Sequence, residues 1–529
     1  VQDIWKVYAE LLGSKKNKRE IQIAKLLHNG ETLTDNSSIA DAFNSFFATI
    51  GEKLAKNVDS LDASNHYLQY MKKLNLTMTS MYITPVSEEE VLKIIMSLDP
   101  HKAAGTDDFH VKSIKNSIPY TLKALTYVFN SSFSQSTVPD KLKISKVIPI
   151  YKKKEAFLPG NYRPISLLSM FDKILEKLMY ARLYPFLTKN NLLYEYQFGF
   201  RSNHSTTLAV TEIVDNIREE LDKNNHVLGL YLDLSKAFDC VNHNILLDKL
   251  SLYGIRGQVN DWFKSYLKDR SQITLANGTY SKMCPVNTGV PQGSVLGPIL
   301  FLIYVNDIAQ CVNSGKVRLF ADDTNLFFSC KSIPTLEKNA NESLLNLYKW
   351  FSSNKLTLNA DKTCFTVFSN SKEKPNIKLT LKGTPIENVP VSKYLGMHRD
   401  DKLNWKTHIN NIKNKLNQLT GAFYNLARYI DTSKISNIYH AYVFPHIKYG
   451  IELYGACDKT SLKSLQTSQN KILKVLYRKP RRYHTNQIHN ELRILKCEDV
   501  YQLFTGIFVY KQQQKLLPNT PIREDNSSL

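Results

Sequence analysis

Two adjacent carboxylates stand between short apolar stretches in the string Phe320-Ala321-Asp322-Asp323. Residues 317–321 predict one strand, and residues 326–328 predict the strand that returns after a turn. Neighbouring carboxylates repel each other, so packing gives no reason to place them together. A divalent ion such as Mg²⁺ removes this objection because it binds carboxylate and phosphate oxygens together. A solvated Asp-Asp hairpin turn is the alternative, and these four residues alone favour it.

A third carboxylate, Asp233, lies at the end of an almost wholly apolar stretch, residues 227–234. Such a stretch predicts a buried strand, and active-site groups collect at the carboxyl ends of strands in α/β folds. A lone carboxylate at the end of a buried strand is costly unless it has a partner. This position therefore favours a functional carboxylate over a structural one.

Basic side chains follow a predicted strand at residues 147–151. Lys152 supplies a point charge, and Arg163 can make bidentate contacts with a phosphate. Together they predict a clamp for a triphosphate, although an ordinary charged hairpin tip fits equally well. A further lysine, Lys362, lies in the loop that enters a predicted strand at residues 364–368.

Two turns rich in small residues could let a nucleic acid strand approach the backbone. One is the basic turn 102–108, which contains Gly105, and the other is the string 289–294, which contains Gln292 and Gly293. The second turn opens an apolar helix predicted at residues 295–305. Simple punctuation by Gly and Pro is the alternative for both turns.

The elements that must position these residues belong to a basic chain of 529 residues with a formal net charge of +21. Hydrophobic residues make up 43%, which allows a sizeable core. The charge indicates an anionic partner, and nucleic acid is the first candidate. A membrane surface is less favoured because the basic residues are not gathered on one amphipathic helix. The longest uncharged stretch, between Lys282 and Asp307, is interrupted by prolines and is too short in its apolar part to span a bilayer.

The seven cysteines include no C-x-x-C pair, and we expect them to be reduced and buried in an intracellular protein. The first residues are not a signal peptide and lack an initiator Met, so a fragment is expected.

Residues 1–85 are expected to be helical, with a helix at 39–47 capped by residues 35–38. Apolar residues 409–426 recur at spacings of 3 and 4, which predicts a helix packed in a bundle. Basic clusters at residues 15–19 and, with tyrosines, at 477–483 are candidate contacts for nucleic acid.

Six strings occur in an order that resembles the reverse transcriptase family, most closely the polymerases of non-LTR retrotransposons of the jockey-like type. They are Asn161-Tyr162-Arg163-Pro164-Ile165-Ser166-Leu167-Leu168, Gln197-Phe198-Gly199-Phe200-Arg201, Asp233-Leu234-Ser235-Lys236-Ala237-Phe238-Asp239, Gly289-Val290-Pro291-Gln292-Gly293-Ser294, Phe320-Ala321-Asp322-Asp323 and Lys393-Tyr394-Leu395-Gly396.

The resemblance implies an α+β right-hand polymerase with fingers, a ferredoxin-like palm sheet and a helical thumb. Asp233, Asp322 and Asp323 match the family's catalytic carboxylates, which hold two Mg²⁺ ions, with Mn²⁺ as an alternative, and the backbone carbonyl of Leu234 joins them. The reaction implied is RNA-directed DNA synthesis from dNTPs on an RNA template with a DNA primer or target.

The resemblance also implies nucleotide contacts. Phe238 matches the bulky residue that excludes a ribose 2′-hydroxyl, although an aromatic core residue is a serious alternative. Gln292 matches a residue that orients nucleotide and template, and Lys362 matches the lysine proposed to protonate pyrophosphate. Lys152 and Arg163 complete the nucleotide set. Template or primer contacts fall on Gly105, Arg201, Gly293, Tyr394, Leu395 and Gly396.

The expected organisation is a helical N-terminal connector at 1–85, a fingers extension at 86–131, the reverse transcriptase domain at 132–398 and a helical thumb region at 399–529. The endonuclease domain of full elements is expected to be missing. Departures from the family pattern, Thr106-Asp107-Asp108 and Lys154-Glu155, put template contacts in doubt but not the metal site. The family's mechanism implies action in the nucleus, although no targeting signal stands out. A viral RNA polymerase, an intron maturase or a catalytically inactive relic that only binds RNA are the alternatives.

Overall fold

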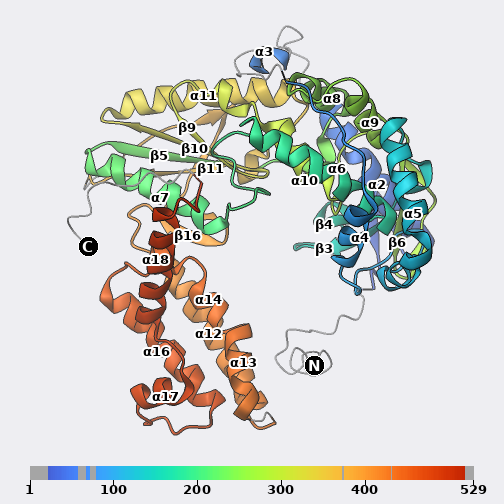
Figure 1. Ribbon diagram of the computed structural model, residues 1–529. Coiled ribbons are helices and arrows are strands. Elements are labelled where there is room, and N and C mark those ends of the chain that lie inside the picture. Colours follow the sequence, from blue (N-terminus) through green and yellow to red (C-terminus); the bar gives the residue numbers. More distant parts are fainter. Residues whose placement is uncertain (1–21, 57–66, 72–78, 372–374, 430–431, 519–529) are drawn as a thin grey trace.

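The computed structural model describes residues 22–56, 67–71, 79–371, 375–429 and 432–518 (Figure 1). It mixes helices with two five-stranded sheets, as the sequence predicts for an α+β protein. The basic cluster at residues 15–19 lies outside the described residues. Among the described helices, none is long and apolar enough to cross a membrane.

The central sheet carries the three carboxylates. Its strands follow the spatial order β14-β11-β5-β10-β9. They are β5 (His226–Leu232), β9 (Lys316–Phe320), β10 (Asp323–Cys330), β11 (Cys364–Phe368) and β14 (Glu387–Asn388). In the row β11-β5-β10-β9 each strand is antiparallel to its neighbour, and helices follow β5 and β10 along the chain. Counted over the strands of this sheet alone, the chain runs β-α-β-β-α-β, which is a ferredoxin-like succession.

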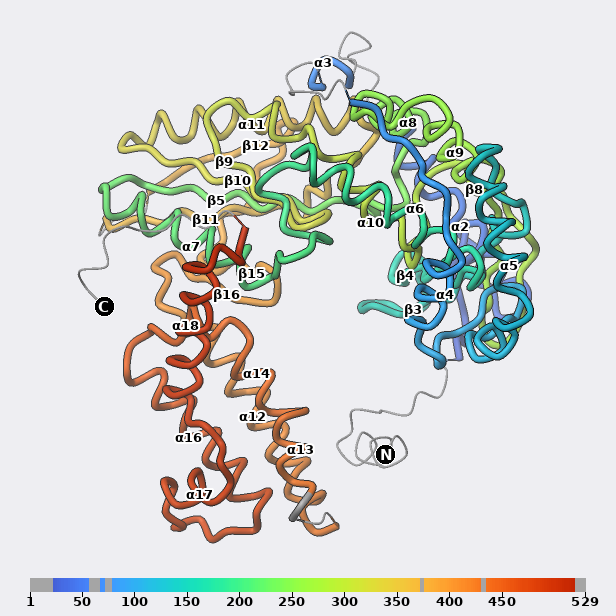
Figure 2. The backbone as a smooth tube through the Cα atoms, in the orientation of Figure 1, coloured from blue at the N-terminus to red at the C-terminus, as the bar shows by residue number. Residues whose placement is uncertain are grey.

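Helices cover both faces of the central sheet (Figures 1 and 2). Helix α11 (Ile333–Ser353) lies along one face, and α7 (Thr206–Asp222) lies along the other. The apolar helix expected at 295–305 is α10 (Leu296–Val305), which is buried almost throughout. Helix α10 packs against α6 (Met170–Lys189) and α8 (His243–Leu252). Helix α9 (Gln258–Leu267) comes after α8 in the chain and packs against it. A helix without a polar face is buried on all sides, so α10 is a core element.

The second sheet has the order β4-β3-β6-β7, with β8 also paired to β6. Its strands are β3 (Ile144–Tyr151), β4 (Tyr162–Leu167), β6 (Arg270–Ala276), β7 (Thr279–Tyr280) and β8 (Cys284–Val286). Helices α4 (Glu88–Met96) and α5 (Val111–Ser134) lie in this part of the molecule (Figure 1). Ser87 caps α4 by accepting a hydrogen bond from the backbone of Glu90.

The N-terminal segment differs from expectation. A hairpin of β1 (Leu26–His28) and β2 (Glu31–Leu33) precedes the expected helix, so this segment is not wholly helical. The helix itself is longer than predicted, α2 (Asn36–Lys56), and Asp35 caps it by accepting from the Ser38 backbone. The hairpin was missed because three-residue strands carry too little periodicity to be recognised. A short helix, α3 (Leu68–Met71), follows.

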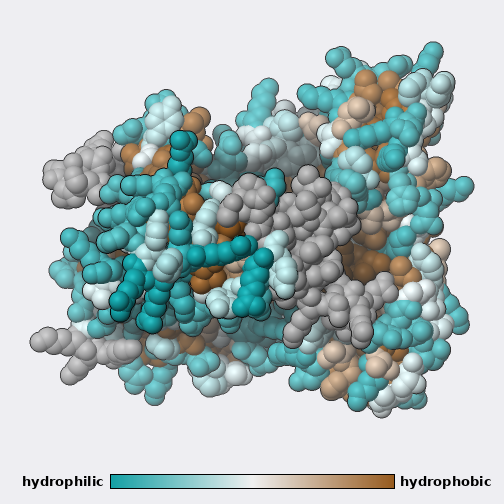
Figure 3. Space-filling view, turned by 90° about the horizontal axis from the view of Figure 1, so that it is seen from below, coloured by the Kyte–Doolittle hydropathy of each residue, from teal (hydrophilic) through white to brown (hydrophobic). Residues whose placement is uncertain are grey.

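The C-terminal helices form an extension below the central sheet (Figures 1 and 2). They are α12 (Lys406–Leu426), α13 (Thr432–Tyr442), α14 (Phe444–Lys448), α15 (Ile451–Tyr454), α16 (Lys459–Leu476), α17 (Thr485–Leu492) and α18 (Cys497–Gln513). The apolar face predicted on α12 is buried against α16, and one core continues from α7 into these helices. The end of this extension is largely hydrophilic when seen from below (Figure 3).

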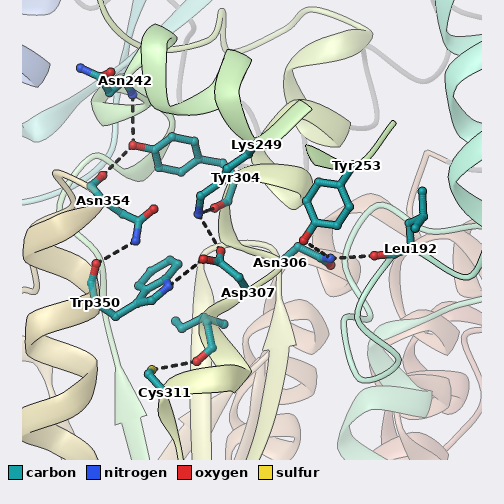
Figure 4. Close-up of polar contacts among 11 residues, drawn as sticks. Leu192, Asn242, Lys249, Tyr253, Tyr304, Asn306, Asp307, Cys311, Trp350 and Asn354 are labelled. Carbon is teal, nitrogen blue, oxygen red and sulfur yellow. Dashed lines mark hydrogen bonds and ion pairs between the residues drawn. The ribbon is translucent and has the colours of Figure 1, made fainter. Parts of the chain in front are cut away.

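A buried polar network holds α8, α10 and α11 together (Figure 4). Lys249 Nζ donates to Asp307 Oδ1 at 2.6 Å and to the backbone oxygen of Tyr304 at 2.6 Å. Trp350 Nε1 donates to the other oxygen of Asp307 at 3.2 Å. Burial of a charged pair is tolerated only when its hydrogen-bonding capacity is met inside the protein, as it is here.

Candidate active site

The three predicted carboxylates meet at one end of the central sheet. Thr324 of β10 pairs with Leu232 of β5, so Asp323 stands beside Asp233 where the two strands end. Asp322 is in the turn between β9 and β10. Asp233 and Asp323 line a common pocket with Lys362. Sheet register thus joins side chains that are about ninety positions apart in the sequence.

The hairpin that carries Asp322 is held in an unusual conformation. Ala321 has a φ of 56°, a left-handed value that is uncommon for residues other than glycine. Its backbone N–H donates to Gln197 Oε1 at 3.0 Å, and the same oxygen accepts from Gly199 N at 2.9 Å. A side chain on Gly199 would collide with the Ala321 backbone. Gln197 and Gly199 therefore position the carboxylates, a role that their string alone did not reveal.

The carboxylates disfavour one another's ionisation. Partial burial and repulsion from Asp322 and Asp233 raise the pKa of Asp323 to about 6. Partial burial, with repulsion from Asp233, also raises the pKa of Asp322, while Arg163 and Lys152 oppose that rise. A bound cation would relieve both effects, since positive charge favours the ionised form.

Lys362 supplies one cation. Its Nζ donates to Asp233 Oδ2 at 2.6 Å, and both side chains are partly exposed. As the described residues lie, no group of three or more carboxylate, His or Cys side chains is arranged to hold a metal ion. The donor types nevertheless suit Mg²⁺, which takes carboxylate oxygens. A metal at Asp233 would have to replace Lys362, at least in part.

Two more predicted cations face this site. Arg163 pairs with Ile150 across β3 and β4, and Lys152 follows at the hairpin tip. Partial burial and repulsion from Arg163 and Lys362 lower the pKa of Lys152. The three basic residues are therefore close enough to repel each other. Such a group becomes stable when an anion with several charges binds between its members.

Gln292 is held by a residue that the sequence analysis did not assign. Its Nε2 donates to Asp239 Oδ1 at 2.8 Å, and its backbone oxygen accepts from Ser166 N at 2.8 Å. Burial raises the pKa of Asp239 to about 6, although Gln292 and Lys236 lower it. Asp239 belongs to the string that begins at Asp233, but no local signal indicated its partner.

Phe238 is half-buried. Its ring stacks on Phe301 of α10 at 4.6 Å between centroids, and Phe200 approaches at 6.3 Å. Its backbone oxygen accepts from Val290 N at 2.9 Å. One face of the ring is therefore part of the core, as the aromatic alternative predicted. Phe238 is also the chain neighbour of Asp239, which accepts from Gln292.

Three predicted template contacts make contacts within the protein. Gly105 is buried, and a Cβ there would lie 2.6 Å from Ser169 N, so the glycine makes room for the chain itself. This corrects the expectation that Gly105 faces nucleic acid. Arg201 donates to the backbone oxygens of Tyr194 at 2.8 Å and Gln197 at 3.2 Å, which stabilises its own loop. Gly293 is exposed, but a Cβ would lie 2.5 Å from Ser166 O.

The predicted template or primer contacts Tyr394, Leu395 and Gly396 lie where two short strands are joined, β15 (Val391–Tyr394) and β16 (Met397–Asp400). Leu395 and Gly396 both have positive φ, 45° and 84°. Tyr394 is buried, and the guanidinium of Arg399 lies 5.1 Å from its ring centroid. The Leu395 backbone oxygen accepts from the Tyr449 hydroxyl of the C-terminal helices. This turn therefore connects the sheet to those helices.

The cysteines are free, as expected, but only some are buried. Cys240, Cys311 and Cys497 are buried, and the other four are partly exposed. The expectation of general burial was therefore wrong, because several strand-end positions leave the sulfur near the surface.

Comparisons with known proteins point to one family. Residues 150–399 match the family described as reverse transcriptase (RNA-dependent DNA polymerase). A probable RNA-directed DNA polymerase from transposon BS of Drosophila melanogaster is 27% identical over 487 residues, covering 86% of this chain and 53% of that protein. The RNA-directed DNA polymerase from mobile element jockey of the same fly is 29% identical over 459 residues, covering 84% and 49%.

A third relative, a probable RNA-directed DNA polymerase from transposon X-element of Drosophila melanogaster, is 28% identical over 431 residues, covering 79% of this chain and 47% of that protein. The chain therefore spans about half the length of these relatives. The predicted resemblance to the polymerases of jockey-like non-LTR retrotransposons is confirmed.

Proposed function

We propose, on the premise that residues 150–399 form a reverse transcriptase domain, that this chain is an RNA-directed DNA polymerase that copies retroelement RNA into DNA. The observation that carries the proposal is the meeting of Asp233 with Asp322 and Asp323 at the end of one sheet, beside Lys152, Arg163 and Lys362. Carboxylates next to a group of cations suit a metal-bound polyphosphate, because each set of charges finds its complement.

In this proposal Asp233, Asp322 and Asp323 hold two Mg²⁺ ions with the backbone carbonyl of Leu234. When bound, these ions would neutralise the triphosphate and lower the pKa of the primer 3′-hydroxyl. The raised pKa of Asp323 supports this assignment, since crowded carboxylates gain most from a bound cation. Mn²⁺ would serve as an alternative ion.

The remaining residues bind and orient the nucleotide. Lys152 and Arg163 bind the triphosphate, and Lys362 leaves Asp233 to place its proton near the leaving pyrophosphate. Gln292, held by Asp239, orients the base and template. Phe238 presents the edge that is not stacked on Phe301 to the sugar, where it would exclude a 2′-hydroxyl.

The same proposal assigns the larger structural units of the protein to the parts of a right-hand polymerase. The central sheet is the palm, the second sheet with α4 and α5 forms the fingers, and the helices after residue 399 are the thumb. The exposed Gly293 and Gly396, with the half-buried Leu395, contact template and primer, and the buried Tyr394 supports their turn. The proposed domains keep the boundaries that the sequence predicts, after residues 85, 131 and 398. Since the primer would be a DNA target, we place this activity in the nucleus.

The test is primer extension on an RNA template with dNTPs and Mg²⁺, comparing the wild type with Asp322→Asn. The variant keeps the shape of the side chain but removes its charge, so we expect synthesis to fall at least about 1000-fold. RNA binding should remain within about twofold, because it depends on basic residues elsewhere. Asp269→Asn, at an exposed turn between α9 and β6, is the matched control and should extend normally.

RNA binding is measured separately over a range of salt concentrations. A steep fall of affinity with salt is expected for a protein that neutralises several phosphates. Wild-type protein that binds RNA but does not extend the primer would contradict the proposed function. Equal extension by the wild type and Asp322→Asn would contradict the assignment of the carboxylates.

A further inference from the structure

Two glycines from distant parts of the chain closely approach the segment that follows Asp233. This segment, η3 (Ala237–Cys240), is a short 3₁₀ helix that starts directly before Phe238 and Asp239. A Cβ on Gly289 would lie 2.9 Å from both the Cα and the carbonyl oxygen of Asp239. A Cβ on Gly51 would collide with the same carbonyl oxygen and lie 2.6 Å from Thr288 Oγ1. The Asp239 backbone therefore has no room to move toward either glycine.

Gly51 belongs to α2, which lies outside the residues that match the reverse transcriptase family. Its φ is not in the left-handed region, so its conformation would accept alanine. Glycine inside a helix weakens that helix relative to alanine. The close approach to Asp239 is the reason that the structure offers for glycine at this position.

Helix α2 cannot easily shift to relieve such a collision. Asn44 is fully buried, and its Nδ2 donates to the backbone oxygens of Gln272 at 3.2 Å and Lys282 at 2.7 Å. Its Oδ1 accepts from Gln272 Nε2 at 3.0 Å and Thr274 Oγ1 at 3.1 Å. All four hydrogen-bonding positions of this amide are thus used, which fixes α2 against β6.

Further contacts run along the helix. Asp41 accepts from the Lys282 backbone at 2.7 Å, and Glu52 accepts from Asn287 Nδ2 at 3.1 Å. Lys236 Nζ lies 5.8 Å from the Phe46 ring centroid. Helix α2 lies beside β6 and β8 in Figures 1 and 2. The helix therefore contacts both the segment with Phe238 and the loop that leads to Gln292.

We infer that α2, through Gly51, is a positioning element for nucleotide selection, and that the matched region 150–399 does not set its nucleotide site alone. This inference rests on the proposed function and deepens it. Gly51 fixes the Asp239 backbone, Asp239 holds the Gln292 amide at 2.8 Å, and the neighbouring Phe238 takes its place by the same contact. Residues 36–56 thus determine where the sugar and base of an incoming dNTP fit.

The experiment compares Gly51→Ala with Gly421→Ala in the full chain. Gly421 also lies inside a helix, but a Cβ there would meet nothing within 4 Å. We expect Gly51→Ala to raise the KM for dNTPs about tenfold and to weaken discrimination against ribonucleotides. Maximal rate should change less than about threefold, and RNA affinity should be unchanged. Gly421→Ala should match the wild type in all of these.

A milder pair keeps the test decisive if Gly51→Ala fails to fold. Glu52→Ala removes the hydrogen bond to Asn287, and Lys53→Ala alters an exposed neighbour on the same helix. Glu52→Ala should raise the KM for dNTPs about twofold relative to Lys53→Ala. If Gly51→Ala folds, a KM for dNTPs and a discrimination equal to those of Gly421→Ala would overturn the inference. If it does not fold, equal values for Glu52→Ala and Lys53→Ala would overturn it. An inactive wild type would instead refute the proposed function.

Discussion

Two lysine–aspartate pairs of equal length lie in opposite surroundings. Lys249 Nζ is 2.6 Å from Asp307 Oδ1, and neither side chain has exposed surface. Lys362 Nζ is 2.6 Å from Asp233 Oδ2, but 47% and 36% of these side chains are exposed. The buried pair has further hydrogen-bond partners inside the protein, including Trp350 (Figure 4). Other charged groups lie near the exposed pair, so either member of the pair can form an ion pair with one of them instead.

The difference shows that distance alone does not give an ion pair its role. In the buried pair, loss of one charge leaves the other without water or a partner, so the pair is structural. In the exposed pair, water and ions can replace either partner at little cost, so Asp233 stays available for chemistry. Asp239 is intermediate, because its partner is a neutral amide and its side chain is only partly exposed.

The largest effect is expected at the buried pair. Lys249→Met removes the ammonium and leaves Asp307 buried without its countercharge. We expect the free energy of unfolding to fall by about 3–5 kcal/mol. Urea denaturation followed by circular dichroism measures this change.

The control for that variant is Lys223→Met, which breaks a pair with Glu219 of similar length, 2.7 Å, whose side chains are about half exposed. It should leave the free energy of unfolding almost unchanged, because solvent screens an exposed pair. The double variant Lys249→Met with Asp307→Leu should recover part of the loss, because the unpaired charge is gone. Equal effects of Lys249→Met and Lys223→Met would break the comparison.

A smaller effect, dependent on pH, is expected at Asp239. Its pKa is raised to about 6, so the folded protein binds this proton more tightly than the unfolded chain does. Stability relative to Asp239→Asn should therefore fall as the pH rises from about 4 to about 6, and then level. We expect a fall of about 1–2 kcal/mol, less than the full shift implies because the side chain is partly exposed.

Denaturation of both proteins at several pH values tests this expectation. Asparagine keeps the oxygen that accepts from Gln292 but does not titrate, so the difference between the two proteins isolates Asp239. A difference that is constant between pH 4 and 7 would contradict the raised pKa. Asp269→Asn serves again as the exposed control.

The smallest change in stability is expected at the exposed pair. Lys362→Met should alter the free energy of unfolding by less than about 1 kcal/mol. It should nevertheless slow nucleotide addition by roughly 10- to 100-fold, because a positioned proton donor contributes at least that much. Single-turnover extension measures the rate, and Lys338→Met, at another exposed pair, is the control. If Lys362→Met greatly lowered the free energy of unfolding and left the rate of nucleotide addition unchanged, the exposed pair would be the structural one, contrary to the roles assigned here.

Much of the central sheet was predictable. The strand at 364–368 has the bounds that its sequence predicted, and those predicted at 227–234 and 317–321 are within two residues of β5 and β9. The strand predicted at 326–328 lies inside the longer β10. Apolar runs ended by polar residues mark such strands in the sequence itself. The N-terminal hairpin was missed, because two strands of three residues have no detectable period. The close approach of Gly105 to Ser169 was also not predicted, since a glycine's neighbours in space cannot be read from its string.

By itself the sequence indicated the candidate carboxylates and cations, most of the helices and strands that hold them, and the family that residues 150–399 match. These features are encoded in short strings and in periods of a few residues. Only the tertiary structure decided that Lys362 pairs with Asp233, that Asp239 holds Gln292 and that Gly51 limits the space around Asp239. Each of these contacts joins residues from distant parts of the chain, and packing of whole elements, not local pattern, brings them together.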